Sequence, residues 1–112
     1  MTVPDPPEVT DLEAAAEWRL HKVDANPDDR QSAAAAQRLQ KLADDLRHSQ
    51  SSPLYREYGT IINWLAESDD ISDFTQLTHD YRLRIGIDAF PETGEDYLRI
   101  LLQMAKQTFG TP

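Results

Sequence analysis

Along this 112-residue chain, apolar residues recur at spacings of three and four, the period of an amphipathic helix, and no segment alternates as a strand does. Helix-start and helix-stop residues divide the pattern into segments. The predicted helices span residues 10–25, 27–48, 53–66, 71–85 and 93–109. We therefore predict an all-α fold, a single-domain bundle of about five amphipathic helices. Residues 1–9 contain three prolines and are typical of a flexible N-terminal arm, which leaves residues 10–110 as the bundle domain.

Capping chemistry sets the predicted boundaries. Thr10 and Glu13 have the spacing of a capping box, so the first helix is expected to begin at Thr10. Asn26 is expected to end this helix and, followed by Pro27, to cap the second one. The further boundary signals are Ser52 before Pro53, Gly86 before apolar Ile87, Thr93 and Gly110.

The last predicted helix is more apolar than a surface helix needs to be. Its apolar residues occupy an arc of roughly 200° when each residue turns the helix by about 100°. They are Tyr97, Leu98, Ile100, Leu101, Leu102, Met104, Ala105 and Phe109. A stripe of about 100° or slightly more suffices at a surface. We therefore expect the C-terminal helix either to face an interface or, more simply, to be central in the bundle.

The first predicted helix has two apolar faces on nearly opposite sides. One face consists of Leu12, Ala16, Leu20 and Val23, and the other of Ala14, Trp18, His21 and Ala25. If the first face packs into the core, Trp18 is left partly exposed beside His21. Because tryptophan is enriched among the residues that dominate protein interfaces, Trp18 and His21 form a candidate interaction surface.

The charge balance narrows the range of partners. The chain has 20 acidic and 11 basic residues, for a net charge of −9. Direct nucleic-acid binding and attraction to an anionic membrane both need clustered Lys and Arg, so neither is expected. A basic protein partner is compatible with this charge. The absence of Cys excludes disulfides and thiolate chemistry. Together with an N-terminus unlike a signal peptide, it favours a soluble, cytoplasmic protein.

Acidic residues concentrate at two predicted turns. An up-down bundle places its first and third turns at the same end, which would bring Asp28 and Asp29 close to Asp69, Asp70 and Asp73. Such a cluster could steer a basic partner. Helix capping and favourable interaction with helix dipoles explain the same acids without a partner.

The sequence carries no motif that indicates catalysis or metal binding. His21 and His48 each follow an acid by four residues, and His79 precedes Asp80, but the two Glu-x-x-His motifs of a ferritin-like site are absent. The stretch from Asp69 does not match a calcium-binding loop. No nucleophile elbow or Gly-rich phosphate loop is present. We therefore predict no metal site and no cofactor.

These observations favour a small, acidic protein-interaction module, such as an adaptor, an inhibitor or a regulatory protein. Its predicted contact surface combines Trp18 and His21 with the acidic turns, and a homo-oligomer formed through the first or last helix is a close variant. One alternative is a small enzyme or metal-binding bundle that uses the histidines. The other is a nucleic-acid mimic that blocks a basic groove.

Overall fold

The computed structural model describes residues 7–111, and most of them belong to five helices. The helices are α1 (Pro7–Ala25), α2 (Arg30–His48), α3 (Pro53–Glu67), α4 (Ile71–Arg84) and α5 (Gly94–Phe109). This part of the chain contains no strand, and a single isolated bridge joins Ile85 to Ala89 in the α4–α5 loop. The prediction of an all-α bundle is confirmed.

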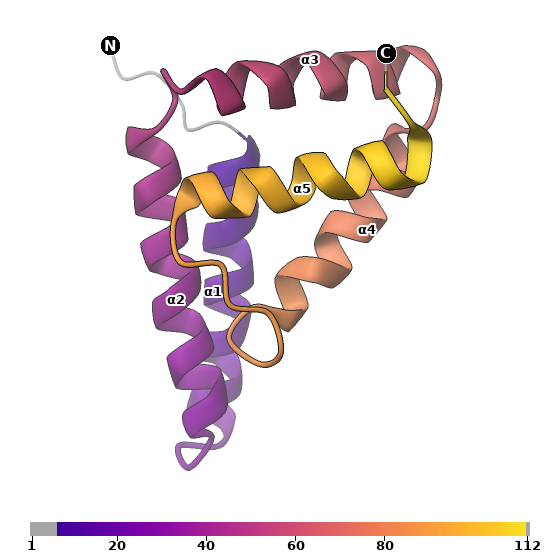
Figure 1. The fold of residues 1–112 in the computed structure, drawn as a ribbon. Coiled ribbons are helices and arrows are strands. Elements are labelled where there is room, and N and C mark those ends of the chain that lie inside the picture. Colours follow the sequence, from indigo (N-terminus) through magenta and orange to yellow (C-terminus); the bar gives the residue numbers. More distant parts are fainter. Residues whose placement is uncertain (1–6, 112) are drawn as a thin grey trace, which may run out of the picture.

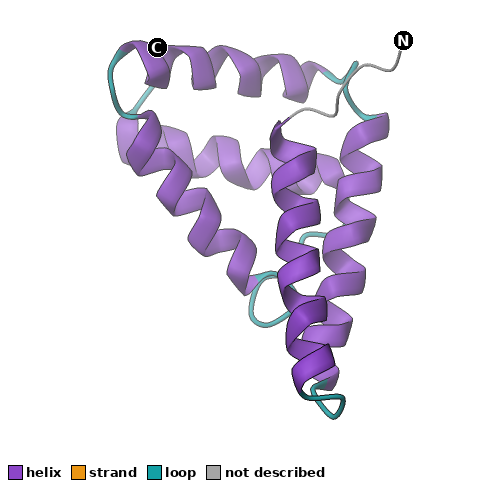
Figure 2. Cartoon of the chain, turned by 180° about the vertical axis from the view of Figure 1, so that it is seen from behind, coloured by secondary structure: helices purple, strands orange, loops and turns teal. Residues whose placement is uncertain are grey.

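The helices form a hairpin and a second group that packs across it. Helices α1 and α2 lie side by side in opposite directions (Figure 1). Helix α5 packs on both α2 and α3, whereas α4 slants from the end of α3 back towards α1 (Figures 1 and 2). The predicted central position of the C-terminal helix is confirmed, because α5 joins the hairpin to α3.

Most of the apolar arc of α5 is buried. Its buried residues are Gly94, Tyr97, Leu98, Leu101, Leu102 and Ala105. All of them except Gly94 belong to one core that also contains Leu12 of α1, Leu42 of α2, Ile61 of α3 and Phe74 of α4. Burial of such side chains contributes about 1.5–3 kcal/mol each to folding before the cost of ordering the chain.

Local capping explains the boundaries of α3 and α5. The Ser52 hydroxyl accepts a hydrogen bond from the Leu54 amide at 3.3 Å, and Pro53 occupies the first turn of α3. The Thr93 hydroxyl accepts one from the Asp96 amide at 3.1 Å. Gly110 ends α5 with a φ of 88°, a conformation that favours glycine. These predicted boundaries are confirmed.

The beginning of α1 differs from the prediction. The helix starts at Pro7, because proline is well suited to the first helical turn. Thr10 therefore lies inside the helix, and Val9, expected in the flexible arm, is fully buried in the core. Residues 1–6 of the predicted arm lie outside the described residues.

The cap of α2 also differs from the prediction. The helix begins at Arg30, and the cap is Asp29 rather than Asn26. The Asp29 carboxylate accepts hydrogen bonds from the Ser32 amide at 3.0 Å and the Ser32 hydroxyl at 2.7 Å. Asn26 instead stabilises the turn, since its side-chain oxygen accepts a hydrogen bond from the Asp28 amide at 3.3 Å. Two hydrogen bonds make Asp29 the better cap.

Two glycines allow other segments to approach the backbone of α2. A Cβ atom at Gly94 would lie 2.6 Å from the Leu46 nitrogen, and one at Gly86 would lie 2.5 Å from the Ala35 Cα. Gly86 has the positive φ expected of it. Ile87, the apolar residue that follows Gly86, is exposed.

Candidate functional site: a groove between α1 and α4

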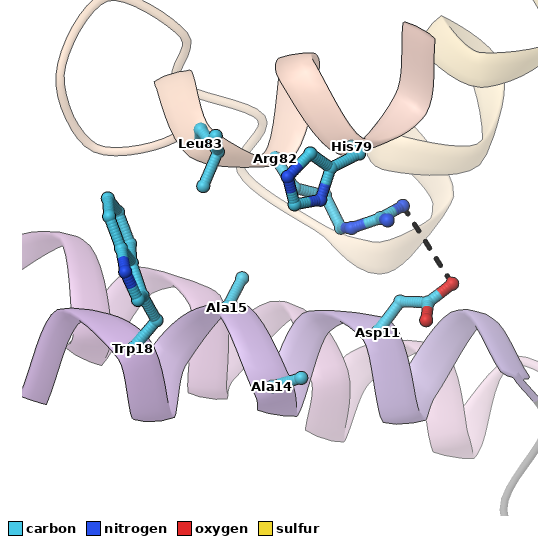
Figure 3. Close-up of a pocket in the computed structure, with 7 residues that line it drawn as sticks. All are labelled: Asp11, Ala14, Ala15, Trp18, His79, Arg82 and Leu83. Atoms are coloured by element: carbon cyan, nitrogen blue, oxygen red, sulfur yellow. Dashed lines mark ion pairs between the residues drawn. The ribbon is translucent and has the colours of Figure 1, made fainter. Parts of the chain in front are cut away.

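A groove of about 360 Å³ lies between α1 and α4. Its lining residues are Asp11, Ala14, Ala15 and Trp18 from α1 and His79, Arg82 and Leu83 from α4. Trp18 stands at one end, the pair of Asp11 and Arg82 lies at the other, and Ala15 lies between them (Figure 3). The small side chains of Ala14 and Ala15, one turn before Trp18, leave the space in front of the indole open.

Trp18 is partly exposed, and two cations lie against its ring. The residue is 41% exposed. The Lys22 Nζ atom lies 4.1 Å from the indole centroid and the Arg19 Cζ atom lies 4.8 Å from it, so two cations contact the ring. The predicted partial exposure of Trp18 is confirmed.

The face of α1 that enters the core differs from the predicted one. Leu12 and Ala16 are buried as expected, but Leu20 is 42% exposed and Arg19 is only 6% exposed. Arg19 is buried because its Nη2 group donates a hydrogen bond to the Leu83 carbonyl at 2.5 Å, at the end of α4. A helix C-terminus offers free carbonyl groups and a favourable site for a cation.

The same arginine reaches α2. The Arg19 Nη1 group lies 3.5 Å from the Ser32 hydroxyl, at the limit of hydrogen bonding, and this hydroxyl in turn donates to Asp29. The hydrogen bonds from Ser32 hold the pKa of Asp29 below its usual value, and the positive charges of Lys22 and Arg19 contribute in the same direction. Arg19 thus holds α1, α2 and α4 together.

Arg82 has a different environment. The residue is 7% exposed, and the buried Tyr97 hydroxyl lies close enough to its guanidinium group to interact with it. Its Nη1 atom lies 3.9 Å from a carboxylate oxygen of half-exposed Asp11, which is an ion pair beyond hydrogen-bond distance. Figure 3 shows the guanidinium group on the groove side of α4.

Tyr97 lies behind Arg82. Burial raises the pKa of Tyr97 to about 12, and the positive charge of Arg82 limits the rise. The Tyr97 hydroxyl is close enough for this effect but has no partner of good hydrogen-bond geometry among the described residues. Its ring stacks on Tyr81 with centroids 6.1 Å apart. The guanidinium group of Arg82 therefore lies close to the buried Tyr97 hydroxyl.

The remaining predicted site residues do not come together. His21 is exposed but does not line the groove. The α1–α2 turn and the α3–α4 turn lie at separate corners of the molecule (Figures 1 and 2). Asp28 and Asp29 are thus far from Asp69, Asp70 and Asp73, and the expected single acidic cluster is wrong. The reason is that α3 runs across the hairpin rather than beside it.

The three histidines lie on three different helices, His21 on α1, His48 on α2 and His79 on α4. Within residues 7–111, no three His, Asp or Glu side chains are placed to share a metal ion. His48 contacts the carbonyl of Asp44 in its own helix. Asp80 accepts a hydrogen bond from Gln76 at 3.0 Å, an arrangement within α4 that does not involve His79.

A second hollow of about 380 Å³ lies between α2 and the α4–α5 loop. Phe90 is 58% exposed at its edge. The Arg38 guanidinium lies 5.5 Å from the Phe90 centroid and donates a hydrogen bond to the Pro91 carbonyl at 3.1 Å. This arginine donates to a backbone carbonyl, whereas the charged partner of Arg82 is Asp11 at 3.9 Å.

Sequence reasoning missed both Arg82 and Phe90. A signal for Arg82 is present in the chain, because it follows Phe74 and Thr78 at spacings of four on the buried face of α4. A basic residue at such a position indicates either a buried partner or a site. Phe90 lies in a loop without periodicity and carries no comparable signal.

No family model matches this chain, and neither the curated proteins nor the solved structures compared with it give a match. None of the helices within residues 7–111 combines the length and the apolar composition needed to cross a lipid bilayer.

Proposed function

We propose that this protein is a protein-interaction module, an adaptor, inhibitor or regulatory protein, that binds its partner in the groove between α1 and α4. The observation that carries the proposal is Trp18, a 41% exposed indole held by two cations at the end of the groove. Interfaces derive much of their affinity from a few aromatic and Arg residues that fill pockets. A cytoplasmic location, favoured by the cysteine-free sequence, is part of this proposal.

The groove has properties suited to a contact site. Its volume of about 360 Å³ can accept one or two side chains of a partner. Ala14, Ala15 and Leu83 provide apolar walls, and Arg82 and His79 provide polar groups. The net charge of −9 can steer a partner of basic overall charge towards the molecule over a longer range.

The test compares the wild type with Trp18→Ala and Phe90→Ala as affinity baits in an extract of the source organism. Phe90 is a matched control because it is an exposed aromatic residue at the other hollow. A partner retained by the wild type and by Phe90→Ala should bind Trp18→Ala about thirtyfold more weakly, the loss typical of an interface hot spot.

Stability measurements show whether a loss of partner binding comes from the missing contact or from unfolding. Because Trp18 is partly exposed, its replacement should cost far less than the ~3–5 kcal/mol of a core Trp→Ala change. Equal capture by the wild type and Trp18→Ala, with both variants folded, would show that the groove is not the contact site.

A further inference from the structure

We infer that the groove between α1 and α4 accepts a carboxylate of the partner on Arg82, next to an apolar side chain that packs on Trp18. This inference rests on the proposed function and specifies the chemistry of the partner segment. The simplest segment of this kind is a C-terminal leucine, whose carboxylate and isobutyl group lie on the same residue.

Arg82 is a buried cation that lines the groove. The residue is 7% exposed, and the Tyr97 hydroxyl and the Asp11 carboxylate lie near its guanidinium group. The 3.9 Å pair with half-exposed Asp11 does not supply the two short bonds that arginine forms with a well-placed carboxylate. A ligand carboxylate in the groove would supply them.

The charge around the groove differs from the charge of the whole chain. The chain as a whole is acidic, but this groove is not: Lys22 and Arg19 lie against Trp18, and Arg82 and His79 line the α4 side. Asp11 is the acidic residue among the lining residues. The surroundings of the groove therefore complement an anionic group rather than a cationic one.

The apolar and the charged parts of the groove lie towards different ends. The apolar surface of Trp18, Ala15 and Leu83 lies at one end of the groove, and Arg82 lies towards the other (Figure 3). A ligand with adjacent apolar and carboxylate groups can occupy both ends at once. A purely apolar ligand would leave Arg82 without a carboxylate at hydrogen-bond distance, and a purely charged ligand would leave the indole uncovered.

Asp11 provides a distinguishing variant. Its carboxylate competes with a ligand for the guanidinium group and repels an anion, so Asp11→Asn should strengthen carboxylate binding, by about threefold to tenfold. If the Asp11–Arg82 pair had only a structural role, the same change would weaken the seam between α1 and α4 and would create no preference for an acid.

The experiment titrates the full chain with N-acetyl-leucine and with N-acetyl-leucinamide and follows the Trp18 indole and Arg82 side-chain N–H signals by NMR. The two probes share size and shape and differ only in the carboxylate. The acid should bind with a dissociation constant on the order of 1–10 mM, since it is a small fragment. The amide should bind at least tenfold more weakly, the loss expected when one charge-assisted pair is missing.

Two variants complete the test. Arg82→Gln should remove the preference for the acid while Trp18 still responds to both probes. Asp11→Asn, an exchange at a half-exposed side chain, should increase the preference, and it keeps the test decisive if Arg82→Gln does not fold.

Equal responses to the acid and the amide near Trp18 would overturn the carboxylate inference and leave apolar docking intact. Absence of a response in the groove even at high probe concentration would overturn the inference as well. The proposed function fails separately, when partner capture does not depend on Trp18.

Discussion

Arg19 and Arg82 are both more than nine-tenths buried, yet their guanidinium groups have different surroundings. Arg19 donates to the Leu83 carbonyl and approaches the Ser32 hydroxyl, so it holds helix ends together. Arg82 has a distant ion pair and lines a groove. Two side chains of the same type therefore differ in their surroundings: Arg19 bridges helix ends, and Arg82 lines the groove.

Asp29 provides a test at the residue scale. Because Asp29 caps α2 through Ser32, Asp29→Ala should lower the midpoint of thermal unfolding at neutral pH. Asp28→Ala is the matched control, since the Asp28 side chain makes no cap and should leave the midpoint nearly unchanged. Equal effects of the two substitutions would contradict the assignment of the cap.

The hydrogen bonds between Ser32 and Asp29 also predict that the stability of the fold depends on pH. Hydrogen bonds from Ser32 lower the pKa of Asp29 in the folded protein, so its contribution is fully present above the pKa of the unfolded chain, near pH 4, and is lost as the pH falls through the folded value. The difference in unfolding free energy between the wild type and Asp29→Ala should therefore shrink on acidification. Urea unfolding at several pH values measures it, and a difference that grew in acid would contradict the sign.

At the scale of the helices, contact with α2 depends on glycine. Gly94→Ala should destabilise the fold by about 1–3 kcal/mol, because the new methyl group would meet the Leu46 backbone. Gly59→Ala in the middle of α3 has open space around it and should stabilise the fold by about 0.5–1 kcal/mol through helix propensity. Chemical unfolding of both variants checks the prediction. A stabilising Gly94→Ala would mean that α5 does not begin against α2 as described.

Sequence reasoning succeeded for helices with local boundary signals. Ser52 and Thr93 act on amides within their own helices, so α3 and α5 were predictable. The buried face of α1 was not predictable, because Arg19 is buried only through a carbonyl of α4 and a hydroxyl of α2. No pattern within α1 contains that information. The groove is likewise a product of two helices far apart in sequence, and only its half-exposed Trp18 was foreseeable.

At the scale of the whole molecule, excess negative charge acts against the compact state. With a net charge of −9 and mostly exposed ion pairs, screening should relieve more repulsion than attraction. Raising the salt concentration from about 10 mM to about 200 mM should therefore raise the midpoint of thermal unfolding. Scanning calorimetry at the two salt concentrations measures this midpoint. A lower midpoint would mean that the ion pairs, such as Arg47 with Glu13, outweigh the repulsion.

The arrangement of the helices bears on the nucleic-acid-mimic hypothesis. Because α3 crosses the hairpin, the acidic turns are separated, and the shared face that a nucleic-acid mimic requires is not formed by them. The same crossing brings α4 towards α1 and creates the groove. The topology thus favours recognition by a groove over recognition by a carboxylate array.

The most direct test of the central claim is site-specific photo-crosslinking in an extract of the source organism. A photoreactive residue is placed at exposed Ala14 in the groove or, as a control, at exposed Ala34 in the second hollow. We predict a defined crosslinked partner from position 14 that disappears with Trp18→Ala, and none from position 34. The same partner crosslinked from position 34 alone would contradict the claim that the groove between α1 and α4 is the binding surface.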